Sequence, residues 1–116
     1  MQPFELSETE HLPGCRKIRV DGELDLAVAD QLQQALERVG PEFNQILIDL
    51  EGCQFIDSTG MAVIVRAHLR MAEDGRRVGI YGASGQVLRV LSVTGLTANG
   101  LVFDSADDAL EFPAEE

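Results

Sequence analysis

The sequence predicts an α/β fold, in which a mixed sheet of about five strands is combined with about four helices. Short apolar runs of strand length alternate with segments whose apolar residues recur at helical spacing. The first two strand-like runs are separated only by the turn signal Pro13-Gly14. A hydrophobic content of 45% with 25% charged residues is typical of a globular protein. The 116 residues suit one domain, 1–116, with an expected core over about 4–112 and an acidic tail at 113–116.

The N-terminal segments predict an antiparallel pair of strands at one edge of the sheet. Phe4-Glu5-Leu6 alternates apolar and polar side chains, and Ser7 to Glu10 can continue this strand. Cys15 to Val20 alternates again, and residues 21–25 lead out of this second strand. Because the connection at Pro13-Gly14 is so short, the two strands pair most simply in the antiparallel direction.

The middle of the chain predicts two helices around a buried strand. Apolar residues at helical spacing over 27–39 predict a first helix, which Gly40-Pro41 ends. Residues 46–50 are apolar at nearly every position, as in a strand covered on both faces, and a loop at 51–54 follows. A second helix is predicted over 58–73. Because its first half is apolar on most sides, part of that helix is either core or a contact surface.

The C-terminal third predicts two more strands and two more helices. Residues 78–81 form the next strand, and Ser84 caps a helix that Thr94-Gly95 closes. A short last strand follows at 101–103. Ser105-Ala106-Asp107-Asp108 has the pattern of a capping box that opens a final helix.

The charge of the chain is strongly negative, with nine basic and twenty acidic residues and a net charge of −11. Such a surface repels nucleic acid and anionic membranes, and it favours a partner with a basic face. The opening segment 1–5 has no basic and then apolar character, so no signal peptide is expected. Apolar runs of about five residues are far too short to cross a bilayer. We therefore expect a soluble, cytoplasmic protein without membrane insertion.

The side chains that enzymes and metal sites need are not arranged for either purpose. Residues 82–86 resemble a nucleophile elbow, but the second glycine comes one place early. His11 and His68 offer no natural base for a serine, and His68 is expected on a helix, at the boundary between core and surface. Cys15 and Cys53 lack a metal-ligand spacing, so we expect two reduced, half-buried thiols. The sequence indicates no enzyme, no metal and no cofactor of its own.

The most informative stretch is Asp57-Ser58-Thr59, which follows a buried strand and opens a helix. Small oxygen-bearing side chains are preferred at helix starts because they accept from unpaired N–H groups. In the simplest interpretation these residues only cap the helix. In the other, the free N–H groups and the helix dipole make an anion site, where a hydroxyl is well placed to carry a phosphate.

Four segments together resemble a known family. They occur in its order and at similar spacing: Gly22-Glu23-Leu24-Asp25, Ile48-Asp49-Leu50, Phe55-Ile56-Asp57-Ser58-Thr59-Gly60-Met61 and Val93-Thr94-Gly95-Leu96. The chain resembles a STAS domain, and specifically a single-domain bacterial anti-sigma-factor antagonist, from about Phe4 to Phe112. Thr97-Ala98-Asn99-Gly100 is looser than the usual link into the last strand.

The resemblance implies a partner switch. The unmodified domain would bind an anti-sigma factor that is itself a serine kinase, and phosphorylation of Ser58 by that kinase would release it. ATP and magnesium belong to the kinase, and a PP2C-type phosphatase would remove the phosphate. Thr59 is the less favoured acceptor, and Asp25 and Asp57 correspond to acidic residues beside the serine. The implied partner-binding residues are Asp25, Asp57, Ser58, Thr59, Gly60 and Met61.

Two other functions stay open at this point. STAS domains also occur in anion transporters and lipid-transport complexes, so the chain could be a non-phosphorylated scaffold subunit in which Ser58 is only a cap. Nucleotide binding by the domain itself is a weaker alternative, because the chain has no phosphate-binding glycine loop.

Overall fold

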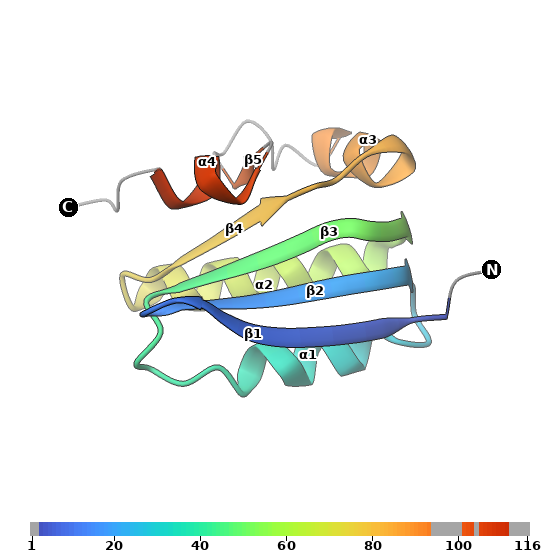
Figure 1. Cartoon of the computed structure of the whole chain (residues 1–116). Helices are drawn as coiled ribbons and strands as arrows, with labels where there is room; N and C mark the ends of the chain where they lie inside the picture. The colour runs from blue at the N-terminus through green and yellow to red at the C-terminus, as the bar shows by residue number, and fades with distance from the viewer. Residues whose placement is uncertain (1–2, 94–100, 104, 112–116) are drawn as a thin grey trace.

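Five strands form one mixed sheet in the order β1-β2-β3-β4-β5 (Figure 1). The computed structural model describes residues 3–93, 101–103 and 105–111. The strands are β1 Glu5–Leu12, β2 Cys15–Leu24, β3 Gln45–Ile56, β4 Arg77–Tyr81 and β5 Val102–Phe103. β1 and β2 are antiparallel, and β2, β3, β4 and β5 are parallel to one another. The predicted α/β class with its N-terminal antiparallel pair is confirmed.

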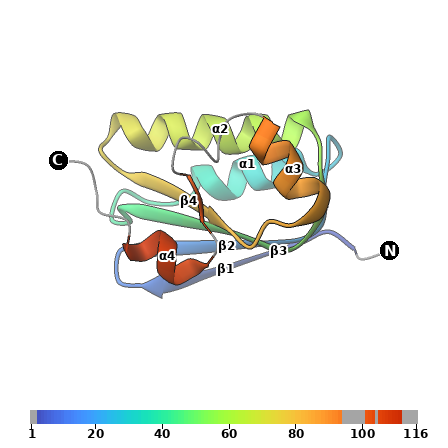
Figure 2. The ribbon, with the colours of Figure 1, turned by 90° about the horizontal axis from the view of Figure 1, so that it is seen from above.

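Four helices cover the two faces of this sheet unequally. They are α1 Ala29–Glu37, α2 Ser58–Glu73, α3 Gly85–Val93 and α4 Ala106–Glu111. Figure 2 shows α1 and α2 side by side on one face and α4 on the other. The main apolar core lies between the sheet and the first three helices, and a smaller cluster around Leu47, Tyr81 and Ala109 lies beneath α4. The face with three helices therefore supplies most of the buried apolar area.

The central strands β2 and β3 are longer than their sequence patterns predict. β2 continues to Leu24 and β3 to Ile56, so the expected exit segment 21–25 and the expected loop 51–54 were wrong. The parallel pairing of β2 and β3 continues to Leu24↔Ile56, but its register shifts twice on the way. Such irregularities break the period of two that identifies a strand in a sequence. The ends of β2 and β3 consequently lie side by side.

Other boundaries agree more closely with the prediction. α2 spans the predicted 58–73, whereas α1 is shorter than predicted at both ends. The backbone N–H of Asp108 donates to Ser105 Oγ at 3.2 Å, so Ser105 caps α4 as predicted. Cys15 and Cys53 are free and each 4% exposed, so both thiols are buried rather than half-buried. The predicted features at 94–100 and 112–116 lie outside the described residues.

Candidate functional site

The helix start after β3 is capped by Asp57 and not by a hydroxyl. The backbone of Asp57 is extended, and its Oδ1 accepts from the N–H groups of Thr59 and Gly60, both at 3.0 Å. The Thr59 hydroxyl donates to the same oxygen. These bonds, above all the one from the Thr59 hydroxyl, hold the pKa of Asp57 below its ordinary value. The N–H groups that we expected to attract a free anion are therefore occupied by a carboxylate of the chain.

Ser58 has a different position from its two neighbours. It is exposed, and within the described part of the chain its hydroxyl has no hydrogen-bond partner. Thr59 is half-buried and its hydroxyl is engaged by Asp57. The interpretation of Ser58 as a plain cap is wrong, because Asp57 does the capping. Of the two hydroxyls, only that of Ser58 is free to react with a group brought by another molecule.

The ends of the parallel strands β2 and β3 bring Asp25 beside this helix start. Oδ2 of Asp57 accepts from the N–H of Leu26 at 3.0 Å, and the Asp57 N–H donates to the Leu24 carbonyl at 3.2 Å. The Asp25 carboxylate closes its own turn by accepting from the Ala27 N–H at 3.1 Å. The carboxylate of Asp57 thus ties the segment after β2 to the start of α2.

Gly60 and Met61, the last two of the expected partner-binding residues, are buried. A Cβ on Gly60 would lie 2.7 Å from Leu24 Cγ and 2.8 Å from the Leu24 carbonyl oxygen. Gly60 therefore permits the close approach of α2 to the end of β2. Met61 is 5% exposed and belongs to the main core, although it also lines the groove beside Ser58. The structure gives both residues a packing role beneath the exposed serine.

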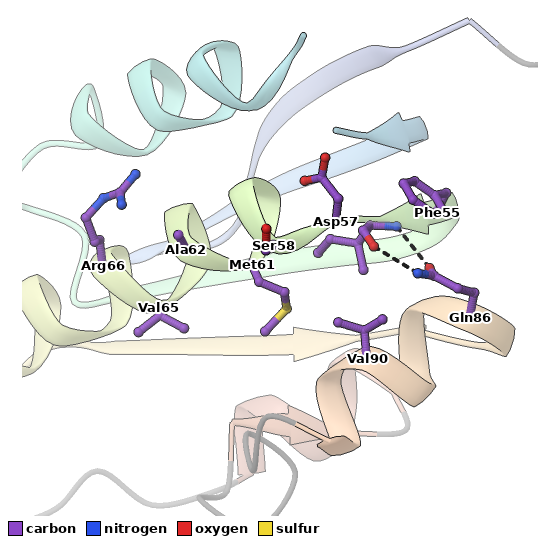
Figure 3. Close-up of a pocket in the computed structure, with 10 residues that line it drawn as sticks. Phe55, Asp57, Ser58, Met61, Ala62, Val65, Arg66, Gln86 and Val90 are labelled. Atoms are coloured by element: carbon purple, nitrogen blue, oxygen red, sulfur yellow. Dashed lines mark hydrogen bonds between the residues drawn. The ribbon is translucent and has the colours of Figure 1, made fainter. Parts of the chain in front are cut away.

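An apolar groove of about 660 Å³ lies between α2 and α3, with Ser58 at its rim. In Figure 3, Met61 of α2 points toward Val90 of α3 across this groove, and Val65 lies farther along α2. The side-chain amide of Gln86 accepts from the Ile56 N–H at 3.0 Å and donates to the Ile56 carbonyl at 2.9 Å (Figure 3). Gln86 thus attaches α3 to the last residue of β3 and satisfies the polar backbone there.

A second hollow of about 280 Å³ lies on the other side of α2, toward α1. Leu26, which is 74% exposed, and Thr59 line it. Ala62 and Arg66 line both hollows. Neither Gln86 nor either hollow was predicted from the sequence, and their one signal there is the excess of apolar residues in the first half of α2. That half supplies both core and accessible surface.

Two further features, a cluster of metal-binding side chains and a helix able to cross a membrane, are absent from the described ranges. Among residues 3–93, 101–103 and 105–111, no three His, Cys, Asp or Glu side chains are grouped so that they could hold a metal ion. No helix in these ranges has the length and apolar character required to span a bilayer. His68 is half-buried on α2, at the boundary predicted for it.

Comparison with known proteins identifies the family. A model of the STAS domain matches residues 7–109. An anti-sigma F factor antagonist of Paenibacillus polymyxa is 29% identical over 107 residues, which cover 89% of this chain and 90% of that protein. An anti-sigma factor antagonist from Mycobacterium paratuberculosis has a similar structure, with a TM-score of 0.78, 22% identity and coverage of 95% and 92%. Phosphorylated SpoIIAA, a Bacillus cell fate determinant, has a TM-score of 0.75, 18% identity and coverage of 92% and 97%. At these identities the two solved structures show a shared fold. Because the family model matches most of its length, the chain belongs to the STAS domain family.

Proposed function

We propose that this protein is an anti-sigma-factor antagonist that acts by partner switching. In its unmodified form it binds an anti-sigma factor that is also a serine kinase, and phosphorylation of Ser58 releases it. The observation that carries this proposal is the exposed Ser58 hydroxyl, which has no structural task at the start of α2. The family membership and the names of the relatives support it.

The proposed modification changes the charge of the surface and leaves the fold unchanged. A phosphate adds about −1.5 to −2 charges at neutral pH. The helix dipole favours this charge by about 0.3–1 kcal/mol, whereas the carboxylates of Asp25 and Asp57 oppose it. Because Asp57 already occupies the N–H groups of Thr59 and Gly60, the phosphate stays at the surface. A partner that covers Ser58 then loses several kcal/mol of binding free energy, through repulsion between like charges or through burial of the phosphate. Its affinity falls about 100-fold or more.

The other participants follow from this chemistry. ATP and magnesium enter with the kinase, and a PP2C-type phosphatase restores the hydroxyl. The domain itself is a cytoplasmic binding protein and not an enzyme. Its net charge of −11 favours a partner with a basic face.

The test is phosphorylation by the kinases encoded in the same genome. The protein is incubated with each purified kinase, ATP and magnesium, and the modified residue is located by mass spectrometry. We expect one phosphate on Ser58, its loss in Ser58→Ala, and its retention in the matched variant Thr59→Ala. Affinity for the kinase, measured by calorimetry, should fall about 100-fold or more on phosphorylation. Equal affinities of the two forms would refute the switch, and the absence of modification by every kinase would favour a scaffold subunit.

A further inference from the structure

Three side chains form a ridge along the outer side of α2. Ser58, Ala62 and Arg66 are spaced four residues apart, so they lie along one side of the helix. Figure 3 shows all three beside the groove that α2 shares with α3. Ala62 and Arg66 also line the hollow toward α1. We call this feature the α2 ridge. A protein that covers Ser58 along this helix must also meet Arg66.

Arg66, like Arg70 and Arg89, forms no ion pair within the described residues, although the chain is rich in acidic side chains. Arg16, Lys17, Arg19, Arg38 and Arg76 all form ion pairs. Arg66 is exposed, donates only to the neutral Gln33 Oε1 at 3.3 Å, and forms no ion pair with any carboxylate of the described residues. Among the residues that the structure describes, it is the one basic side chain that lines either hollow. A charge of this kind is suited to pair with a carboxylate from another molecule.

An apolar side chain of a partner can fill the groove next to the α2 ridge without a large desolvation penalty. Phe55 is 37% exposed at one end, Val65 of α2 lies at the other end, and Val90 of α3 lies between them. The backbone polar groups of Ile56 at its floor are already bonded to Gln86. An apolar side chain entering the groove therefore displaces water without leaving those groups unpaired.

We propose that the α2 ridge and this groove select the protein partner. The partner that fits places an apolar side chain between Val65 and Val90 and a carboxylate on Arg66. This inference rests on the proposed function, because it assigns a partner to the surface around Ser58. A second copy of the chain is disfavoured as the occupant, because each copy carries a net charge of −11.

Selection by Arg66 is separate from the switch at Ser58. Eight residues of helix place the two side chains about 12 Å apart along the axis at 1.5 Å per residue. This separation exceeds the Debye length of about 8 Å at physiological ionic strength. Charge changes at the two positions should therefore act independently, and their effects on affinity should multiply.

The experiment uses the full-length protein and the kinase that phosphorylates Ser58, with affinities measured by calorimetry at 0.15 M salt. Arg66→Glu should lower the affinity about 10-fold or more, because it replaces an attraction by a repulsion. Ala62→Gln, which adds bulk over both hollows without changing the charge, should lower it about 10-fold. Arg89→Glu is the matched control, since Arg89 is exposed on α3 and lines neither hollow. It should stay within about twofold of the wild type.

Two further measurements extend this test. The double variant Ser58→Glu/Arg66→Glu should show about the product of the two single losses. Exchanging one Asp or Glu of the kinase for Arg should restore binding to Arg66→Glu.

If Arg66→Glu and Ala62→Gln bind like the wild type while Ser58→Glu does not, the proposed selection is wrong and the switch stands. If the unmodified protein binds no kinase, both proposals fail. A dimer abolished by Arg66→Glu in sedimentation would make a second copy the occupant and overturn the proposal.

Discussion

Removing the Asp57 carboxylate should destabilise the protein by a calculable amount. In Asp57→Ala the N–H groups of Thr59, Gly60 and Leu26 all lose their acceptor. Loss of an N-cap costs about 1 kcal/mol, with a range of about 0.5–2. Loss of the bond from Leu26 adds about 0.5–1.5 kcal/mol, part of which water recovers at this half-exposed site. We therefore expect a loss of about 2 kcal/mol in the free energy of unfolding, measured by urea denaturation.

Asp57→Asn separates the two contributions. Asparagine caps helices as well as aspartate does, so Oδ1 can still accept from Thr59 and Gly60. Its amide nitrogen is a donor and would face the N–H of Leu26, which would then have no acceptor. The expected loss is about 1 kcal/mol, between the wild type and Asp57→Ala. The reasoning is refuted if Asp57→Ala unfolds within about 0.5 kcal/mol of the wild type, or if Asp57→Asn is the less stable of the two variants.

The difference in the free energy of unfolding between the wild type and Asp57→Asn should depend on pH, and the pKa of Asp57 fixes the direction of that dependence. The pKa of Asp57 is lowered in the folded protein, first by the Thr59 hydroxyl and also by backbone N–H groups. As the pH falls, the unfolded chain therefore takes up this proton before the folded one does. The stabilisation is complete above the ordinary aspartate pKa of about 3.9 and is lost as the pH falls toward the folded value. The stability gap between the wild type and Asp57→Asn should narrow below about pH 4, and a widening gap would contradict the assignment.

Three other substitutions test a close backbone contact, a buried ion pair and the attachment of α3. Gly60→Ala would gain about 1 kcal/mol from helix propensity, but its Cβ would lie 2.8 Å from the Leu24 carbonyl oxygen. This overpacking should outweigh the gain in helix propensity, so the free energy of unfolding in urea should fall by about 1–3 kcal/mol. A variant more stable than the wild type would show that α2 and Leu24 are not in such close contact. Asp49→Ala should lower the free energy of unfolding by about 2–4 kcal/mol, because it removes a 1% exposed carboxylate that pairs with Lys17 and Arg19. A loss below about 1 kcal/mol would be inconsistent with this ion pairing. Gln86→Ala should lower the free energy of unfolding by about 1–2 kcal/mol and speed hydrogen exchange at the Ile56 N–H. Unchanged exchange at this N–H would show that Gln86 does not bond to Ile56.

The fold could be predicted where one periodic pattern determines an element. The apolar run at 46–50 and the helical spacing after Ser58 placed the first half of β3 and the whole of α2 correctly, because both signals lie within a few consecutive residues. The continuation of β3 through Cys53 depends instead on its pairing with Gly22 of β2. Such a pairing, with its shifts in register, is a contact between distant residues and leaves no local period.

The site was predictable to the level of the segment but not of the atom. Asp57, Ser58 and Thr59 all have an oxygen that can cap a helix, so composition could not decide which of them does so. The decision depends on Leu26, whose N–H at the end of the neighbouring strand meets the Asp57 carboxylate. Gln86 is also invisible locally, because its partner Ile56 is 30 residues away in the chain.

The division of tasks between Asp57 and Ser58 is what makes this helix start suitable for a switch. Had Ser58 been the cap, modifying its oxygen would have removed an acceptor worth about 1 kcal/mol, and signalling would have been coupled to stability. Asp57 instead holds the helix end and the neighbouring strand together, whereas the Ser58 hydroxyl forms no hydrogen bond with any of the described residues. A charge added to Ser58 therefore acts almost entirely on whatever covers the α2 ridge. Because a change of 1.4 kcal/mol alters affinity tenfold, binding can respond strongly while the domain beneath stays the same.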